Sequence, residues 1–182
     1  MERGGSQGIN FIVTIILARI LSPGEYGLIA IVSVFISFAN VFVQGGLNTA
    51  LIQKKDAEEI DYSTIFYITL LIALLLYIIL YFSAPTIANF YSNTQLTPVI
   101  RILSLTLFFG AINSLQVAIV SKQMQFKKLF YSSVGAIFIS GIIGIGMAYF
   151  NYGIWSLVGQ QLTFQIATTF IMFFTVQWRP KL

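Results

Sequence analysis

Cysteine and histidine are absent from this sequence of 182 residues, and charged residues make up only 9% of it. Without cysteine these residues form no disulfide, and without histidine they lack the commonest metal ligand and the usual general base of enzymes. We therefore expect no cofactor, no metal site and no enzymatic activity. Soluble domains carry about 25% charged residues. So little charge beside 57% hydrophobic residues predicts a protein whose solvent is lipid.

Long apolar runs make up most of the chain, and five of them are long enough to cross about 30 Å of hydrocarbon as helices. A sixth run, Gly8–Leu21, would reach only about 21 Å, and so predicts a partial first span. The runs lack the two-residue alternation of barrel strands. Spans are predicted at residues 8–21 (partial), 26–44, 62–82, 98–120, 129–150 and 154–176. We expect an all-α polytopic membrane protein, a six-helix bundle with an incomplete first helix.

Prolines and small residues refine these boundaries. All four prolines fall at or beyond span ends, and Thr97-Pro98 has the order of a helix N-cap followed by the first helical residue. In the span 129–150, small residues recur at every fourth position, namely Ala136, Ser140, Gly144 and Ala148. This stripe predicts a close contact with another helix; a gap for a moving gate is the alternative interpretation.

The distribution of Lys and Arg predicts the orientation of the spans. Eight cations fall on the side of the N-terminus: Arg3, Lys54, Lys55, Lys122, Lys127, Lys128, Arg179 and Lys181. The opposite side receives only Arg19 and Arg101, and its connections 83–97 and 151–153 carry no charge. The positive-inside rule then places both chain ends in the cytoplasm. Because membrane topology explains where the cations lie, the net charge of +4 does not predict a nucleic-acid partner.

Amide side chains occur at helical spacing within three of the spans. They are Asn40 and Gln44, Asn113 and Gln116, and Gln160, Gln161 and Gln165. Residues three or four apart share one face of a helix, and amides in hydrocarbon need partners. Two interpretations stay open: hydrogen bonds between helices, or a polar path for sugar hydroxyls, which amides recognise well.

Arg19 and Arg101 are the strongest candidates for binding a phosphate, because both lie near span ends on the side that is otherwise uncharged. An arginine presents several donors in a planar fork. The alternative is that each side chain extends to the membrane interface. No Asp or Glu lies in the middle of a span, so the sequence shows no proton relay or buried sodium site.

Five strings stand out, in order along the chain: Leu17–Gly27 (LARILSPGEYG), Gln44–Gln53 (QGGLNTALIQ), Met124–Leu129 (MQFKKL), Tyr152–Val158 (YGIWSLV) and Trp178-Arg179-Pro180. They resemble strings of bacterial polysaccharide biosynthesis exporters. These exporters are the lipid-linked oligosaccharide flippases of the multidrug/oligosaccharidyl-lipid/polysaccharide exporter superfamily.

The resemblance implies translocation of undecaprenyl-diphosphate-linked oligosaccharide repeats across the bacterial inner membrane, for O-antigen, exopolysaccharide or capsule synthesis. It also implies alternating access between two six-helix lobes, and a cationic cavity that holds the diphosphate. The expected partners are the lipid-linked oligosaccharide and membrane lipids. Members of this family have twelve or more spans. With about six, this chain is expected to be the N-terminal lobe, completed by a C-terminal lobe or a second chain.

Other functions stay open at this point. A multidrug or cation antiporter of the related branch would need an intramembrane carboxylate, which these spans do not contain. A membrane scaffold without transport activity, or a truncated inactive fragment, would use the small-residue stripe and the amides equally well.

Overall fold

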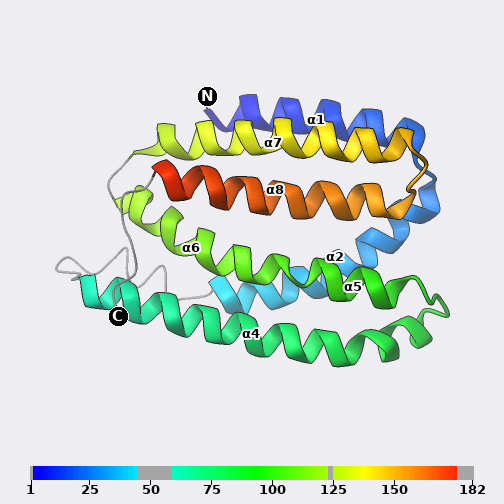
Figure 1. The fold of residues 1–182 in the computed structure, drawn as a ribbon, viewed down its shortest axis with the longest axis horizontal. Helices are drawn as coiled ribbons and strands as arrows, with labels where there is room; N and C mark the ends of the chain where they lie inside the picture. Colours follow the sequence, from blue (N-terminus) through cyan, green and yellow to red (C-terminus); the bar gives the residue numbers. More distant parts are fainter. Residues whose placement is uncertain (1, 45–58, 123–124, 176–182) are drawn as a thin grey trace.

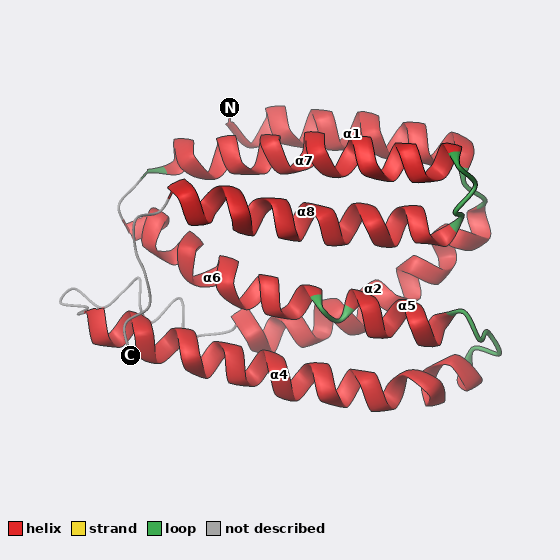
Figure 2. Ribbon diagram, viewed as in Figure 1, coloured by secondary structure: helices red, strands yellow, loops and turns green. Residues whose placement is uncertain are grey.

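The computed structural model describes residues 2–44, 59–122 and 125–175. Within these ranges the chain forms helices and no strand (Figure 2). The helices are α1 (Glu2–Ile20), α2 (Pro23–Gln44), α4 (Glu59–Phe90), α5 (Leu96–Leu103), α6 (Thr106–Lys122), α7 (Phe126–Tyr149) and α8 (Ile154–Thr175). The predicted all-α class is confirmed.

The helices follow the long direction of the molecule in two groups (Figure 1). In one group, α7 packs against both α1 and α8. In the other, α4 packs against α5 and α6, and α2 packs against all three. The groups meet where α2, α5 and α6 contact α8. The main buried cluster extends through both groups and includes Leu17, Val32, Leu103 and Leu157.

The turns that join α1 to α2, α4 to α5 and α7 to α8 lie together at one end of the molecule (Figure 2). Helices α4 and α7 begin at the opposite end, where α6 and α8 finish (Figure 1). This grouping is the one expected of successive membrane crossings. Which end faces the cytoplasm stays a prediction.

Five helical stretches in the described part of the chain are long and apolar enough to cross a membrane. They are Pro23–Gln44, Ile60–Phe90, Leu96–Lys122, Lys127–Tyr149 and Ile154–Thr175. The apolar part of α1, Gln7–Ile20, is shorter, and a polar segment extends that helix back to Glu2. The architecture is that of a polytopic membrane protein.

Helix α4 is longer than the predicted span 62–82, because it continues through Pro85 to Phe90. The prediction that every proline lies at or beyond a span end is therefore wrong for Pro85. A proline removes the N–H that would bond the carbonyl four residues earlier, here that of Tyr81. Arg101 replaces this donor, since its Nε lies 3.4 Å from the Tyr81 carbonyl oxygen. A neighbouring helix thus supplies the bond that lets the helix continue.

The predicted span 98–120 is broken into α5 and α6 by Ser104 and Leu105. The Ser104 hydroxyl donates to the Ile100 carbonyl at 2.6 Å, and the Thr106 hydroxyl donates to the Leu103 carbonyl at 2.5 Å. Hydroxyls that compete for backbone carbonyls favour such interruptions. The predicted N-cap at Thr97 is also wrong: α5 begins at Leu96 after Gln95, so that Thr97 and Pro98 lie in its first turn.

A capping box fixes the turn into α2. The Glu25 carboxylate accepts from the backbone N–H of Ser22 at 2.7 Å and from its hydroxyl at 2.9 Å. Ser-x-x-Glu with Pro23 at the first helical position is a strong helix start. Helix α2 consequently begins three residues before the predicted Tyr26. The same carboxylate lies against Gly153 in the turn between α7 and α8, where φ is +55° and a Cβ would overlap it.

The small-residue stripe of α7 lies in a close helix contact. A Cβ added at Gly144 would come within 2.9 Å of Gln160 Cβ on α8. Ala136, Ser140 and Ala148 are all buried. A Cβ added at Gly141 of α7 would come within 2.9 Å of the Val13 side chain on α1. The stripe therefore forms a packing surface, as its first interpretation predicted.

Candidate functional site

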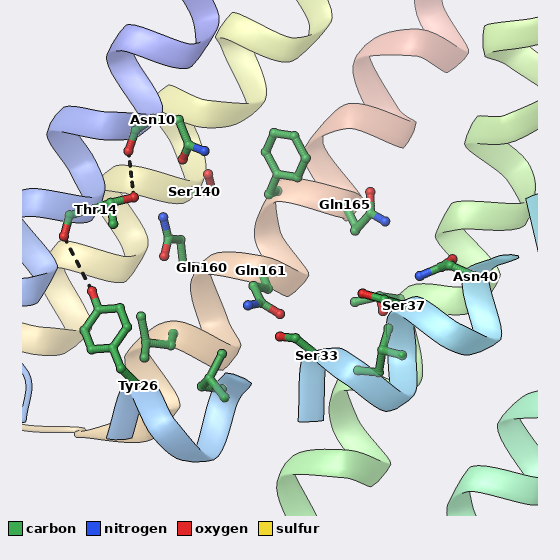
Figure 3. A pocket seen from close by; sticks show the side chains of 15 residues that line it. Asn10, Thr14, Tyr26, Ser33, Ser37, Asn40, Ser140, Gln160, Gln161 and Gln165 are labelled. Atoms are coloured by element: carbon green, nitrogen blue, oxygen red, sulfur yellow. Dashed lines mark hydrogen bonds between the residues drawn. The ribbon is translucent and has the colours of Figure 1, made fainter. Parts of the chain in front are cut away.

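A cavity of about 450 Å³ lies between the two groups of helices (Figure 3). Its walls come from α1 and α8 on one side and from α2 and α6 on the other, with one residue from α7. This volume lies within the range of pockets that bind small organic ligands. On α2, the lining residues Tyr26 to Asn40 span about 21 Å of helix, so the cavity is elongated along the bundle.

Most of the lining residues are neutral and polar. They are Asn10, Thr14, Tyr26, Ser33, Ser37, Asn40, Thr106, Ser140, Gln160, Gln161 and Gln165, beside Ile29, Ile36, Leu157 and Phe164. All of these described lining residues are uncharged. Hydroxyls and amides both donate and accept hydrogen bonds, so the walls can bind a ligand that does the same.

Helical spacing explains how these groups come together. Ser33, Ser37 and Asn40 follow one another at intervals of four and three along α2, so they share one face. Figure 3 shows Ser33 and Ser37 on α2 across from Gln161 and Gln165 on α8.

Hydrogen bonds connect the α1 wall to the start of α2. The Tyr26 hydroxyl donates to the Thr14 carbonyl at 3.5 Å, and the Thr14 hydroxyl donates to the Asn10 carbonyl at 2.9 Å (Figure 3). Because α1 packs mainly on α7, this chain of bonds links the two groups of helices beside the cavity.

The structure separates the predicted amides into three kinds. Asn40, Gln161 and Gln165 line the cavity, as does Gln160. Asn113 is buried on α6, and its Nδ2 lies 3.5 Å from Gln165 Oε1. It therefore contacts a cavity amide across two helices, as the interhelical interpretation expects, and a path for sugar hydroxyls stays a prediction.

Gln44 and Gln116 lie away from the cavity. Gln44 is exposed at the end of α2. Gln116 is buried on α6 and lines a second cavity of about 330 Å³ whose other walls are mainly apolar, among them Phe66, Leu115 and Phe170.

Three buried amide oxygens accept no hydrogen bond from the described residues: Asn40 Oδ1, Asn113 Oδ1 and Gln116 Oε1. Asn40 Oδ1 lies against the backbone of Gly110, 3.2 Å from the position of a Cβ added there, and Gln165 Nε2 lies 4.0 Å from the same point. Amides of α2 and α8 thus converge over the bare backbone of α6. Leaving a buried acceptor unpaired costs free energy, and this cost favours a ligand group that donates a hydrogen bond to it.

The predicted arginines do not line this cavity. Arg19 is exposed near the end of α1. The Arg101 guanidinium stacks on the Tyr81 ring, with Cζ 4.2 Å from the ring centroid, and bonds the Tyr81 carbonyl. The observed contacts of Arg101 are therefore structural. Phosphate binding by either arginine stays a prediction.

Other predicted charges fall partly outside the described residues. Four predicted cations lie outside the described residues, namely Lys54, Lys55, Arg179 and Lys181, and the side chain of Arg3 is not described. Most of the string Gln44–Gln53 and all of Trp178-Arg179-Pro180 also lie outside them. Among the described residues there is no group of three His, Cys, Asp or Glu side chains that could hold a metal ion.

Sequence reasoning missed most of the hydroxyls in the cavity. Thr14, Tyr26, Ser33 and Ser37 carry hydroxyls, which are common in membrane helices, and the amide of Asn10 was missed as well. The spacing of Ser33 and Ser37 with Asn40 is the signal that could have found them, because it places all three on one face of α2.

Comparison with known proteins identifies the family. The family model described as "Polysaccharide biosynthesis protein" matches residues 16–182. The chain belongs to this family. The resemblance noted in the sequence is thereby confirmed at the level of the family, and the chain is a multi-pass bacterial membrane protein.

Curated relatives agree with this assignment. The chain is 28% identical over 160 residues to the succinoglycan biosynthesis transport protein ExoT of Rhizobium meliloti, covering 88% of this chain and 32% of ExoT. It is 34% identical over 92 residues to the teichuronic acid biosynthesis protein TuaB of Bacillus subtilis, covering 50% of this chain and 19% of TuaB. It is 22% identical over 122 residues to the lipopolysaccharide biosynthesis protein WzxC of Escherichia coli, covering 67% and 25%.

The chain thus spans about a third or less of the length of these relatives. No solved structure matches it significantly.

Proposed function

We propose that this protein translocates undecaprenyl-diphosphate-linked oligosaccharide repeats across the bacterial cytoplasmic membrane for the synthesis of a surface polysaccharide. The observation that carries the proposal is the neutral cavity between the two groups of helices, whose walls bear hydroxyls and amides inside an otherwise apolar bundle. Membership of the polysaccharide biosynthesis family supports it.

The chemistry of the substrate explains why such a cavity is needed. Moving one hydroxyl from water into hydrocarbon without a partner costs roughly 2–7 kcal/mol, and an oligosaccharide carries many of them. A passage lined with side chains that donate and accept replaces the lost water. Side chains such as Gln161 and Gln165 can do so because an amide has two donors and two acceptor positions.

We further propose that additional transmembrane helices, from a second lobe or another chain, complete the passage. The proposal is motivated by the matched region, which covers 32% of the length of ExoT. Both chain ends are proposed to face the cytoplasm, because the cations at the end of α6 and the start of α7, Lys122, Lys127 and Lys128, lie on that side under the positive-inside rule.

The test is complementation of a deletion strain with the complete gene, scored by the amount of surface polysaccharide. We expect the wild-type gene to restore polysaccharide and the double variant Gln161→Leu, Gln165→Leu to lower it severalfold, because leucine offers no hydrogen bonds to the substrate. Gln95→Leu, at an exposed turn residue whose side chain makes no capping bond, is the matched control and should behave as wild type. Normal surface polysaccharide in the deletion strain itself would overturn the proposal.

A further inference from the structure

We infer that the cavity binds the saccharide part of the substrate through its hydroxyls and ring faces and leaves the diphosphate outside it. This inference rests on the proposed function and narrows it. It also departs from the family resemblance, which implies a cationic cavity around the diphosphate.

The hydrogen-bonding character of the walls is the first reason. Among the lining residues, Gln161 and Gln165 on α8 face Ser33 and Ser37 on α2 (Figure 3). Each of these groups both donates and accepts, as does a sugar hydroxyl. A diphosphate only accepts, so the amide carbonyls and hydroxyl lone pairs of the walls would face its negative oxygens.

The aromatic and aliphatic lining is the second reason. Tyr26 and Phe164 contribute rings to the wall, and Ile29, Ile36 and Leu157 contribute aliphatic surface. A sugar ring has C–H faces that pack on such surfaces while its hydroxyls reach the polar groups around them. Aromatic residues combine a large apolar face with polar neighbours in this way. A phosphate gains nothing from the same surface.

Electrostatics is the third reason. Burying an anion without a paired cation costs several kcal/mol even after relaxation. The described lining offers no cation to pair with it, and the two arginines singled out in the sequence have other surroundings: Arg101 stacks on Tyr81, and Arg19 is exposed. The hydroxyls of a saccharide are uncharged and meet no such penalty. The cavity therefore discriminates between the two parts of the substrate by charge.

The test measures binding to the complete protein in lipid nanodiscs with two probes. One is the repeat oligosaccharide released from the host's own carrier lipid by mild acid, and the other is inorganic pyrophosphate. For the wild type we expect binding of the oligosaccharide that pyrophosphate does not compete away. Gln161→Lys and Gln161→Glu should both weaken oligosaccharide binding, to a similar extent and by about tenfold or more, because each introduces an unpaired charge.

If the cavity holds the diphosphate, the two substitutions at Gln161 would change binding in opposite directions. Gln161→Lys would then preserve or strengthen binding, Gln161→Glu would abolish it, and pyrophosphate would compete in the wild type. Those results would overturn the inference. If a Gln161 variant fails to fold, as judged by its melting temperature, the same pair of charges is introduced at Ser37 on the facing wall.

Failure of the proposed function has a different signature. If the wild-type protein binds neither probe, or if the deletion strain makes normal polysaccharide, the proposed translocation is wrong and the inference falls with it. If the wild type binds the oligosaccharide but pyrophosphate displaces it, translocation stands and only the assignment of the cavity to the saccharide is wrong.

Discussion

The contact between Arg101 and the proline-interrupted helix α4 yields a quantitative prediction. Pro85 leaves the Tyr81 carbonyl without its intrahelical donor, and Arg101 fills that role while stacking on the Tyr81 ring. Replacing Arg101 by alanine therefore removes two interactions at once. Replacing Pro85 by alanine restores an N–H that can bond the Tyr81 carbonyl within the helix.

The geometry sets the free energy that each of these two interactions contributes. The stacking, with Cζ 4.2 Å from the ring centroid at a partly exposed position, contributes about 0.5–1 kcal/mol. The bond to the carbonyl is long, at 3.4 Å, and leaving that carbonyl unpaired costs about 1 kcal/mol. Arg101→Ala should thus destabilise the protein by about 1.5–2 kcal/mol. In a Pro85→Ala background only the stacking is lost, so the cost should fall to about 0.5–1 kcal/mol.

A double-mutant cycle on the complete protein in detergent measures this difference. The free energy of unfolding is compared for the wild type, Arg101→Ala, Pro85→Ala and the double variant. Effects of Pro85→Ala on the unfolded chain occur in both backgrounds and cancel. We expect a coupling energy of about 1 kcal/mol. Additive costs would show that Arg101 does not serve the carbonyl freed by Pro85.

Two further predictions concern the end of the bundle where the turns lie. Gly153→Ala should destabilise the protein by about 2 kcal/mol or more, because φ is +55° and the new Cβ overlaps the Glu25 carboxylate. The control Gly146→Ala, with open space on α7, should be neutral or stabilising. Equal melting temperatures for the two variants would refute the overlap. Because the 182 residues lack cysteine, single introduced cysteines can report the topology. A membrane-impermeant maleimide should label Thr94→Cys in intact spheroplasts, but Lys127→Cys only after permeabilisation. The reverse pattern of labelling would show that the proposed orientation is inverted.

Much of the fold was predictable because lipid imposes simple rules on sequence. A run such as 154–176 has few alternatives to a membrane helix, and α8 occupies it almost to the residue. The small-residue stripe at Gly144 was equally informative, since a close approach between helices requires small side chains.

The boundaries that failed depend on contacts between helices rather than on local sequence. Pro85 ends a helix by every local rule, yet α4 continues because Arg101, sixteen positions further on, supplies the missing donor. The break between α5 and α6 at Ser104 was missed because the local sequence gives no sign that a helix ends there. The run 98–120 has the pattern of one continuous span, and the bonds made by two hydroxyls show where it separates into two helices.

The candidate site shows the same division between local pattern and tertiary contact. Spacing alone placed Gln161 and Gln165 on a shared face, but it could not distinguish Asn113, which contacts Gln165, from Asn40, which lines the cavity. That distinction depends on how α2 and α8 sit around α6. With Arg101 held by Tyr81 and the lining uncharged, the polar groups of this bundle are matched to hydroxyls. Cations for a diphosphate would then have to come from beyond the walls described for this cavity.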